Sequence, residues 1–268
     1  QEISLGSGWL IGNNDGGPAP VWGLTFDAVR LTFAIDSLSV DAFWAKLAEL
    51  NGSLFADDVD LFGVYGSFTG IEGIELDAYW FWVHDERPLM DTAGTPLVEW
   101  LEKGFDLDNY KHSDLHTLGL RAGGGIPLGE IASLDFEAEV AYQFGDQGQA
   151  GSMFAPWGYG DDDADLSEWG ANLEVGLGLN VALSPRIYLG YAYFGGDNNR
   201  EITLREWLNP FNKPDASLSF NRLFSNWSYS AILDGSEMSN AHIFRAGGSV
   251  APTEKIEVAL DVGYYRAD

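Results

Sequence analysis

Residues 133–146, SLDFEAEVAYQFGD, alternate polar and apolar side chains at every second position. Asp135, Glu137 and Glu139 belong to one set, and larger apolar side chains such as Phe136 belong to the other. A surface helix would group the two classes with a period of about 3.6 residues, whereas a strand alternates them with a period of two. The stretch therefore predicts a β-strand with one wet face and one apolar face.

The same alternation recurs along the chain and predicts an all-β fold of about eleven strands without a helix of normal length. Segment 41–50 has helical propensity, but its neighbours favour a strand there too. The register of that strand is left open, because turning Asp41 inward puts Lys46 beside Trp44, and the other register reverses this. The predicted strands are 2–10, 25–36, 38–49, 58–68, 74–85, 115–126, 133–145, 168–182, 186–195, 240–250 and 255–266.

The connections between these strands alternate between long and short. Long ones, such as the segment between residues 85 and 115, are followed by tight ones, such as the turn at Asp36 and Ser37. An up-and-down meander with long loops at one end and short turns at the other is typical of an outer-membrane β-barrel. A soluble sandwich has no reason to separate loop lengths in this way.

The number of strands decides which face meets which solvent. A soluble barrel of about eight strands would point its apolar set inward. A barrel of about eleven is too wide for side chains to fill, so we expect a wet interior and a lipid-facing apolar set. Aromatic groups near strand ends are expected to form interfacial girdles, although ordinary core aromatics are the alternative. These groups are Tyr79, Trp80 and Trp82, then Tyr191 and Tyr193, then Tyr264 and Tyr265.

The polar face of the predicted strands supplies the candidate pore-lining residues. An arginine in the lipid face would cost about 2–4 kcal/mol, so Arg30, Arg121 and Arg245 are expected to face the lumen. They either meet the cargo or pair with lumen carboxylates and hold the wall together, and both roles are compatible. The full set is Arg30, Arg121, Arg245, Asp135, Glu137, Glu139, Gln143, Asn172, Glu174, Glu257 and Asp261.

Composition excludes several classes of function. A net charge of −27 with only 14 lysines and arginines disfavours nucleic-acid binding. The absence of cysteine excludes disulfides and cysteine-ligated metals. No apolar run approaches the roughly 20 residues of a membrane-spanning helix.

The sequence points to neither catalysis nor a bound metal or cofactor. No GxSxG motif is present, and His112 and His116 lack the HExxH pattern. The acidic run at 161–165 lacks the spacing of a calcium loop, which favours a solvated loop. We therefore predict no catalytic residue, metal or cofactor.

Several stretches together resemble the alginate export family of Gram-negative outer-membrane barrels. They are QEISLGSGWLIGNNDGGPAPVWGLTFDAVRLTF, VDAFWAKLAE, HTLGLRAGGGIP, LDFEAEVAYQFGD, PRIYLGYAYFGGD, FNRLF and APTEKIEVALDVGYYRAD. The resemblance implies one transmembrane barrel domain over residues 1–268, out of a family barrel of about eighteen strands. The first stretch resembles the family's middle, so we expect further strands at both ends. The implied location is the outer membrane of a Gram-negative bacterium, in contact with lipid and lipopolysaccharide.

Two functions follow as hypotheses. The first is a channel that passes a hydrophilic solute or polysaccharide through a charged lumen. The second is a structural or interaction barrel whose long acidic loops dock a partner protein or a surface polymer. The resemblance implies a cation-lined conduit for a polyanion, but the predicted lumen set holds more acids than bases. That field favours cations or neutral solutes over uronate chains.

Overall fold

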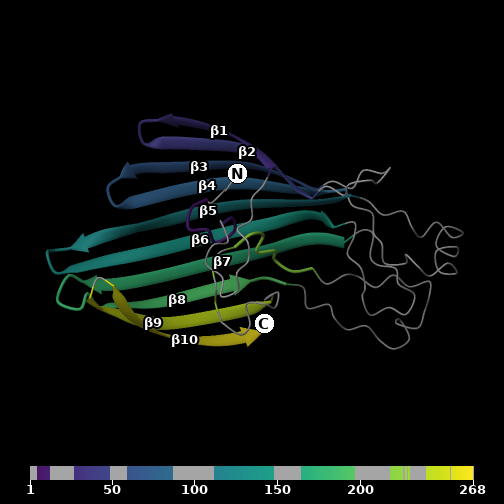
Figure 1. The fold of residues 1–268 in the computed structure, drawn as a ribbon. Helices are drawn as coiled ribbons and strands as arrows, with labels where there is room; N and C mark the ends of the chain where they lie inside the picture. The colour runs from purple at the N-terminus through teal and green to yellow at the C-terminus, as the bar shows by residue number, and fades with distance from the viewer. Residues whose placement is uncertain are drawn as a thin grey trace, which may run out of the picture.

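The computed structural model describes residues 5–12, 27–48, 59–86, 112–147, 164–196, 218–225, 227, 229, 240–253 and 255–267. These residues form one antiparallel sheet of ten strands, each paired with the next along the chain, and no helix (Figure 1). The predicted up-and-down meander is confirmed, with ten strands in place of eleven. The strands are β1 (Asp27–Ile35), β2 (Leu38–Ala48), β3 (Val59–Ile71), β4 (Ile74–Asp85), β5 (Ser113–Leu128), β6 (Ala132–Gln147), β7 (Ala164–Leu179), β8 (Arg186–Phe194), β9 (Ala241–Thr253) and β10 (Ile256–Ala267).

The strand predicted over residues 2–10 is wrong for its described part. Residues 5–10 turn and bend, because Gly6 and Gly8 adopt φ angles of 55° and 75°. Left-handed backbone of this kind breaks an extended strand. Trp9 and Leu10 follow and are both buried, so this segment does not alternate between two solvents.

Short and long connections lie at opposite ends of the sheet, as predicted. The short ones separate β1 from β2, β3 from β4, β5 from β6, β7 from β8 and β9 from β10. Since every strand reverses direction, all five lie at the same end, on the left of Figure 1. The turn between β3 and β4 depends on Gly73, which adopts a φ of 74°. Its absent Cβ would also collide with the backbone oxygen of Gly125.

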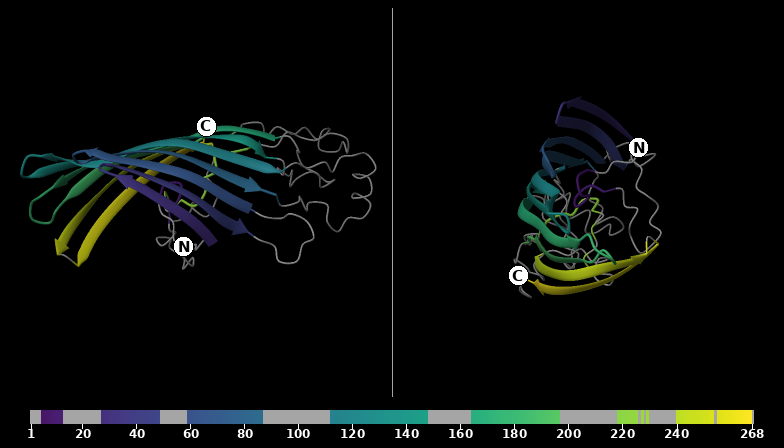
Figure 2. Two further views of the ribbon diagram at one scale, coloured as in Figure 1. Left: turned by 90° about the horizontal axis from the view of Figure 1, so that it is seen from above. Right: turned by 90° about the vertical axis from the view of Figure 1, so that its left-hand side faces the viewer.

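The sheet is strongly curved. Seen from its end it forms an arc, and residues 5–11 lie inside the hollow of that arc (Figure 2). Within the described part of the chain β1 and β10 are the two edges and do not pair with each other. The sheet is therefore an open section of wall with a convex and a concave face. No helix among the described residues is long and apolar enough to cross a membrane.

The convex face is apolar. Leu31, Leu189 and Leu260 are 71 %, 69 % and 72 % exposed on it, although buried leucine is the rule in a water-soluble core. Near the long-loop ends of the strands an aromatic band crosses this face. Its neighbouring ring centroids lie 4.7–6.4 Å apart, and its members are Trp80, Trp82, His116, Tyr142, Phe144 and Trp169.

Two residues of the predicted girdles lie on the other face. Tyr79 is buried on the concave side, where its hydroxyl donates to Glu139 at 2.7 Å. Tyr265 also faces inward and donates to the backbone oxygen of Tyr229. Both follow from the alternation, because each is one residue away from an outward-facing aromatic, Trp80 or Tyr264.

The two faces of β10 provide a direct test of this orientation. Leu260→Arg puts a charge on the convex face near the middle of the strand and is expected to destabilise the folded protein in lipid vesicles by about 2–4 kcal/mol. Ala259→Arg, its neighbour on the concave face, is the matched control and should change the stability by about 0.5 kcal/mol or less. Urea titration followed by tryptophan fluorescence measures both. Equal losses would contradict the assignment of faces.

Candidate functional site: the concave face and the unit inserted in it

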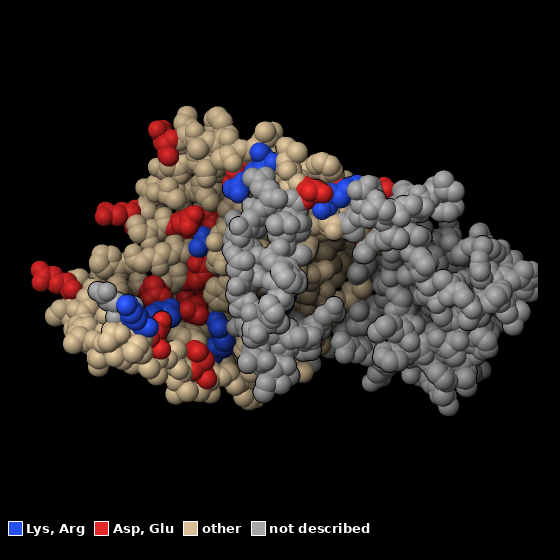
Figure 3. All heavy atoms as spheres, in the orientation of Figure 1, with Lys and Arg blue, Asp and Glu red and all other residues tan. Residues whose placement is uncertain are grey.

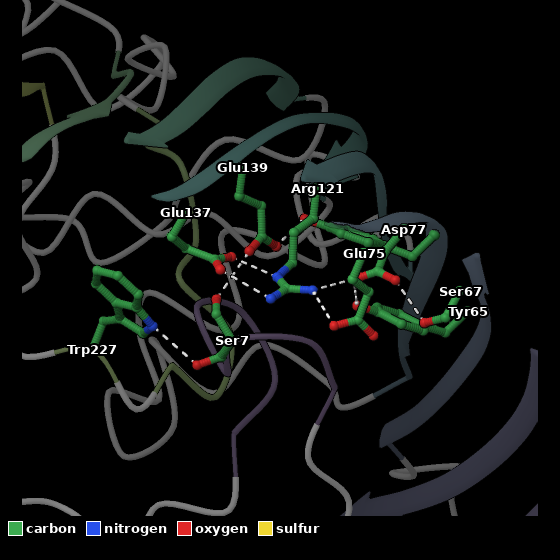
Figure 4. A network of polar contacts seen from close by, with 10 residues as sticks. Ser7, Tyr65, Ser67, Glu75, Asp77, Arg121, Glu137, Glu139 and Trp227 are labelled. Atoms are coloured by element: carbon green, nitrogen blue, oxygen red, sulfur yellow. Dashed lines mark hydrogen bonds and ion pairs between the residues drawn. The ribbon is translucent and has the colours of Figure 1, made fainter. Parts of the chain in front are cut away.

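A band of ion pairs crosses the concave face (Figure 3). Strand register places Asp77, Arg121 and Glu139 side by side on β4, β5 and β6. Arg121 donates from Nε and Nη2 to Glu137 at 2.5 and 2.9 Å, and from Nη1 to Asp77 at 2.5 Å and Glu75 at 3.3 Å (Figure 4). One guanidinium therefore joins carboxylates from both neighbouring strands.

Asp77 shows how a fully buried carboxylate is tolerated on this wall. Its side chain is 0 % exposed, and that of Arg121 is 9 % exposed. Besides Arg121, the carboxylate accepts hydrogen bonds from Tyr65 Oη at 2.7 Å and Ser67 Oγ at 2.6 Å. A buried charge is stable only when it is paired and hydrogen-bonded in this way.

Two further ion-pair clusters occupy the concave face. Arg186 binds Asp135 and, at 2.9 Å, Glu174, which also accepts from Arg245 at 2.9 Å. On the opposite side of the arc Arg30 forms a two-pronged pair with Asp41 at 3.0 and 2.7 Å. Arg30 thus binds a carboxylate of the next strand, whereas Arg186 and Arg245 each reach a carboxylate past one intervening strand, which ties the wall together.

Two segments distant in sequence join inside the hollow. Residues 5–12 meet residues 218–225, Trp227 and Tyr229, and we call this assembly the inserted unit. Gly12 N donates to Phe224 O at 2.9 Å, and Phe224 N donates to Leu10 O at 2.8 Å. Ile11 and Phe224 form a parallel bridge. Backbone hydrogen bonding therefore makes the two segments one object.

Aromatic packing attaches the inserted unit to the wall. Trp9 is 1 % exposed, and its ring centroid lies 6.1 Å from that of Phe194 on β8 and 5.8 Å from that of Phe220. Phe220 lies over Gly170 of β7, where a Cβ would collide with its ring. The surrounding buried cluster includes Phe43, Tyr65, Tyr79, Phe81, Ala192 and Ile243. The expectation of a wholly wet interior is therefore wrong for this part of the concave face.

Polar contacts set the position of the inserted unit. The side chain of Gln143 donates to Asn221 O at 2.7 Å and accepts from Asn221 N at 2.6 Å. Ser7 Oγ donates to Glu139 at 3.2 Å. Trp227 Nε1 donates to Ser7 O at 3.0 Å, which ties the two segments together (Figure 4).

Tyr229 forms a second polar anchor. Its hydroxyl accepts from Trp9 Nε1 at 2.8 Å and donates to Asn172 Oδ1 at 3.0 Å. Burial raises the pKa of this hydroxyl, which keeps it protonated and able to donate.

All the residues proposed as pore-lining lie on the concave face, but they serve different contacts. The three arginines and three of the six carboxylates, Asp135, Glu137 and Glu174, form the ion pairs described above. Glu139, Gln143 and Asn172 bind the inserted unit. Asp261 accepts from Tyr188 Oη, and Glu257 shares its side of β10 and is exposed.

The sequence analysis missed several members of this network. Arg186 directly follows Pro185 at the start of β8, where alternation has barely begun. Asp77 lies two residues before Tyr79 and therefore shares its face of β4. Because the sequence analysis assigned Tyr79 to a lipid-facing girdle, it did not place Asp77 on the concave face. Asp41 faces inward, which settles the open register and puts Lys46 on the convex side, 3.7 Å from Asp60.

Nothing in the described part of the chain forms a metal centre, since it contains no group of three or more His, Asp or Glu side chains placed to hold an ion. His116 lies in the convex aromatic band, between Trp82 and Phe144. Of the acidic run predicted as a loop, Asp161, Asp162 and Asp163 lie outside the described residues, and Asp165 lies in β7.

Arg121 is expected to be the most important single ion-pairing residue of the wall. Arg121→Gln leaves buried Asp77 without its cation and should destabilise the protein in vesicles by about 3–5 kcal/mol. Arg30→Gln is the control. Because the Arg30 guanidinium is 28 % exposed, its loss should lower the free energy of unfolding by only about 1 kcal/mol. Urea midpoints of both variants give the comparison. Equal costs would show that the Arg121 network is not special.

Comparison with known proteins places the chain in a family. The family model described as alginate export matches residues 1–268. A search of curated proteins found no match. Proteins of the matched family are outer-membrane transport channels, which agrees with an all-β sheet of ten antiparallel strands whose convex face is apolar. The chain belongs to the alginate export family.

Proposed function

We propose that the chain forms part of the wall of an outer-membrane channel that passes a hydrophilic solute or polysaccharide without chemistry. The observation that carries this proposal is the division of one curved sheet into an apolar convex face and an ion-paired concave face. An apolar convex face suits lipid, and a charged concave face suits water. The membrane is that of a Gram-negative bacterium, with lipid and lipopolysaccharide around the convex face.

The ion pairs suit a conduit. Carboxylates and guanidinium groups from several strands offer hydrogen-bonding partners to hydroxyl-rich cargo and keep water in the lumen. Because each arginine is held by carboxylates, the lining stays rigid while a cargo slides past. The convergent nucleophile and base that hydrolysis requires are not among these contacts.

The inserted unit narrows the passage. It lies in the long-loop half of the hollow, where we expect it to restrict the passage of a cargo. Its anchors are hydrogen bonds to Gln143, Glu139 and Asn172 together with one aromatic cluster. The same unit also favours the second candidate function, an interaction barrel whose pore stays closed.

Trp9→Ala distinguishes these two functions. Truncating this buried ring should remove about 3–5 kcal/mol of packing that holds the inserted unit. We expect the open fraction in planar bilayers to rise at least about tenfold, since about 1.4 kcal/mol already changes an equilibrium by that factor. Trp169→Ala, on the convex face, is the matched control and should leave conductance unchanged.

The outcomes separate the hypotheses. A conductance that increases only in Trp9→Ala supports a channel restricted by the inserted unit. Absence of conductance in wild type and in Trp9→Ala, with both correctly folded, would favour the interaction barrel.

A further inference from the structure

Resting on the channel function proposed above, the geometry points to a cargo class: we infer that the lumen selects neutral or cationic hydrophilic chains and disfavours polyanions such as polyuronates. This inference comes from how the concave charges are paired, exposed and seated, not from their number alone.

Each arginine of the concave wall is bound to at least one carboxylate. Arg121 uses Nε, Nη1 and Nη2 on Glu137, Asp77 and Glu75. Arg30 and Arg186 each hold a carboxylate through Nε and Nη2. An anionic sugar would have to displace these carboxylates to gain a guanidinium, at the cost of breaking a partly buried ion pair.

Arg245 is bound to one carboxylate and packed against aromatic rings. Its Nη2 binds Glu174, and its Nε is buried without a hydrogen-bond partner. That Nε faces Gly190 of β8, where a Cβ would lie 3.4 Å away. Its guanidinium carbon lies 5.0 Å from the ring centroid of Tyr229 and 5.5 Å from that of Trp227. Aromatic rings of the inserted unit therefore cover this cation.

Glycines of the wall let the other arginines lie against the sheet. A Cβ at Gly123 would come within 2.6 Å of Arg121 Nη2, and one at Gly176 within 2.6 Å of Arg186 Nη2. These guanidinium groups thus occupy space that a side chain would otherwise fill. They lie low on the wall instead of reaching into the hollow.

Carboxylates outnumber arginines on the described part of the concave face. The side chains of Glu75 and Asp135 are 42 % and 40 % exposed, the most exposed members of their ion-pair clusters. Glu257 and Asp261 add exposed carboxylates on the concave side of β10, whose one arginine, Arg266, faces the opposite side. Arg186 and Arg30 are themselves 34 % and 28 % exposed, but each is bound to a carboxylate, so a moving cargo meets a wall with net negative charge.

Cargo chains of different charge should therefore enter the lumen at different rates. Repeated carboxylates on a polyuronate would face the exposed acids in a confined lumen, where like charges repel strongly. Hydroxyls of a neutral glycan can donate to the same acids, and amino groups gain a favourable ion pair. The lining is thus suited to a neutral or amino-bearing chain.

Planar-bilayer recording of the full chain in a KCl gradient tests the inference, with Trp9→Ala providing an open channel if wild type stays closed. We expect K⁺ to permeate at least about threefold better than Cl⁻ at low salt. Glu75→Gln combined with Glu257→Gln should lower this ratio by about half, because it removes two exposed concave carboxylates. Glu72→Gln combined with Glu130→Gln removes two exposed acids from the short turns and should leave the ratio unchanged.

Swelling of liposomes that contain the protein extends the test to glycans. Maltohexaose should enter at least about threefold faster than an oligogalacturonate of equal length. Equal entry, faster entry of the uronate, or a Cl⁻ preference in the bilayer would overturn the inference while leaving the channel function standing. Absence of both conductance and swelling in the open variant would instead contradict the channel function itself.

Discussion

The two-residue period of the β-strand is the constraint on which this structure depends. A lipid bilayer offers no hydrogen bonds to the backbone, so a wall must satisfy its amides between strands. In such a strand, each side chain points to one side of the sheet and its neighbours in sequence point to the other. Leu260 and Asp261 lie next to each other in sequence and face opposite surroundings, one exposed on the convex side and the other bound to Tyr188. The separation of the apolar convex side chains from the charged concave ones follows from that division.

On the concave side, two kinds of stabilisation occupy two halves of the same face. Toward the short turns, arginine–carboxylate pairs join neighbouring strands and keep the lining polar. Toward the long loops, the inserted unit and the rings around Trp9 form a buried cluster. Glu139 lies at the junction, because it accepts from Tyr79 on the wall and from Ser7 on the inserted unit. Stability of the wall and attachment of the inserted unit therefore share residues.

Glycine residues support both halves of the concave face because they have no Cβ atom. Beneath Arg121 and Arg186, missing Cβ atoms at Gly123 and Gly176 leave room for flat guanidinium groups. At Gly170 the same absence admits the ring of Phe220 from the inserted unit. The high glycine content, 33 residues, thus has a steric use in this wall beyond turns.

The sequence by itself determined the strands, the separation of long and short connections, and the face of residues such as Arg121 and Glu137, because all of these follow from local alternation. It failed where partners are distant. Residues 5–10 resemble a strand in sequence. Their position depends instead on packing against Phe194 and Phe220, which lie about two hundred residues further along the chain. The pairing of Asp77 with Arg121, and the clamp between Gln143 and Asn221, likewise arise only when curvature brings strands and inserted segments together. Tertiary structure alone therefore decided which charges of the concave face are paired and where the inserted unit packs.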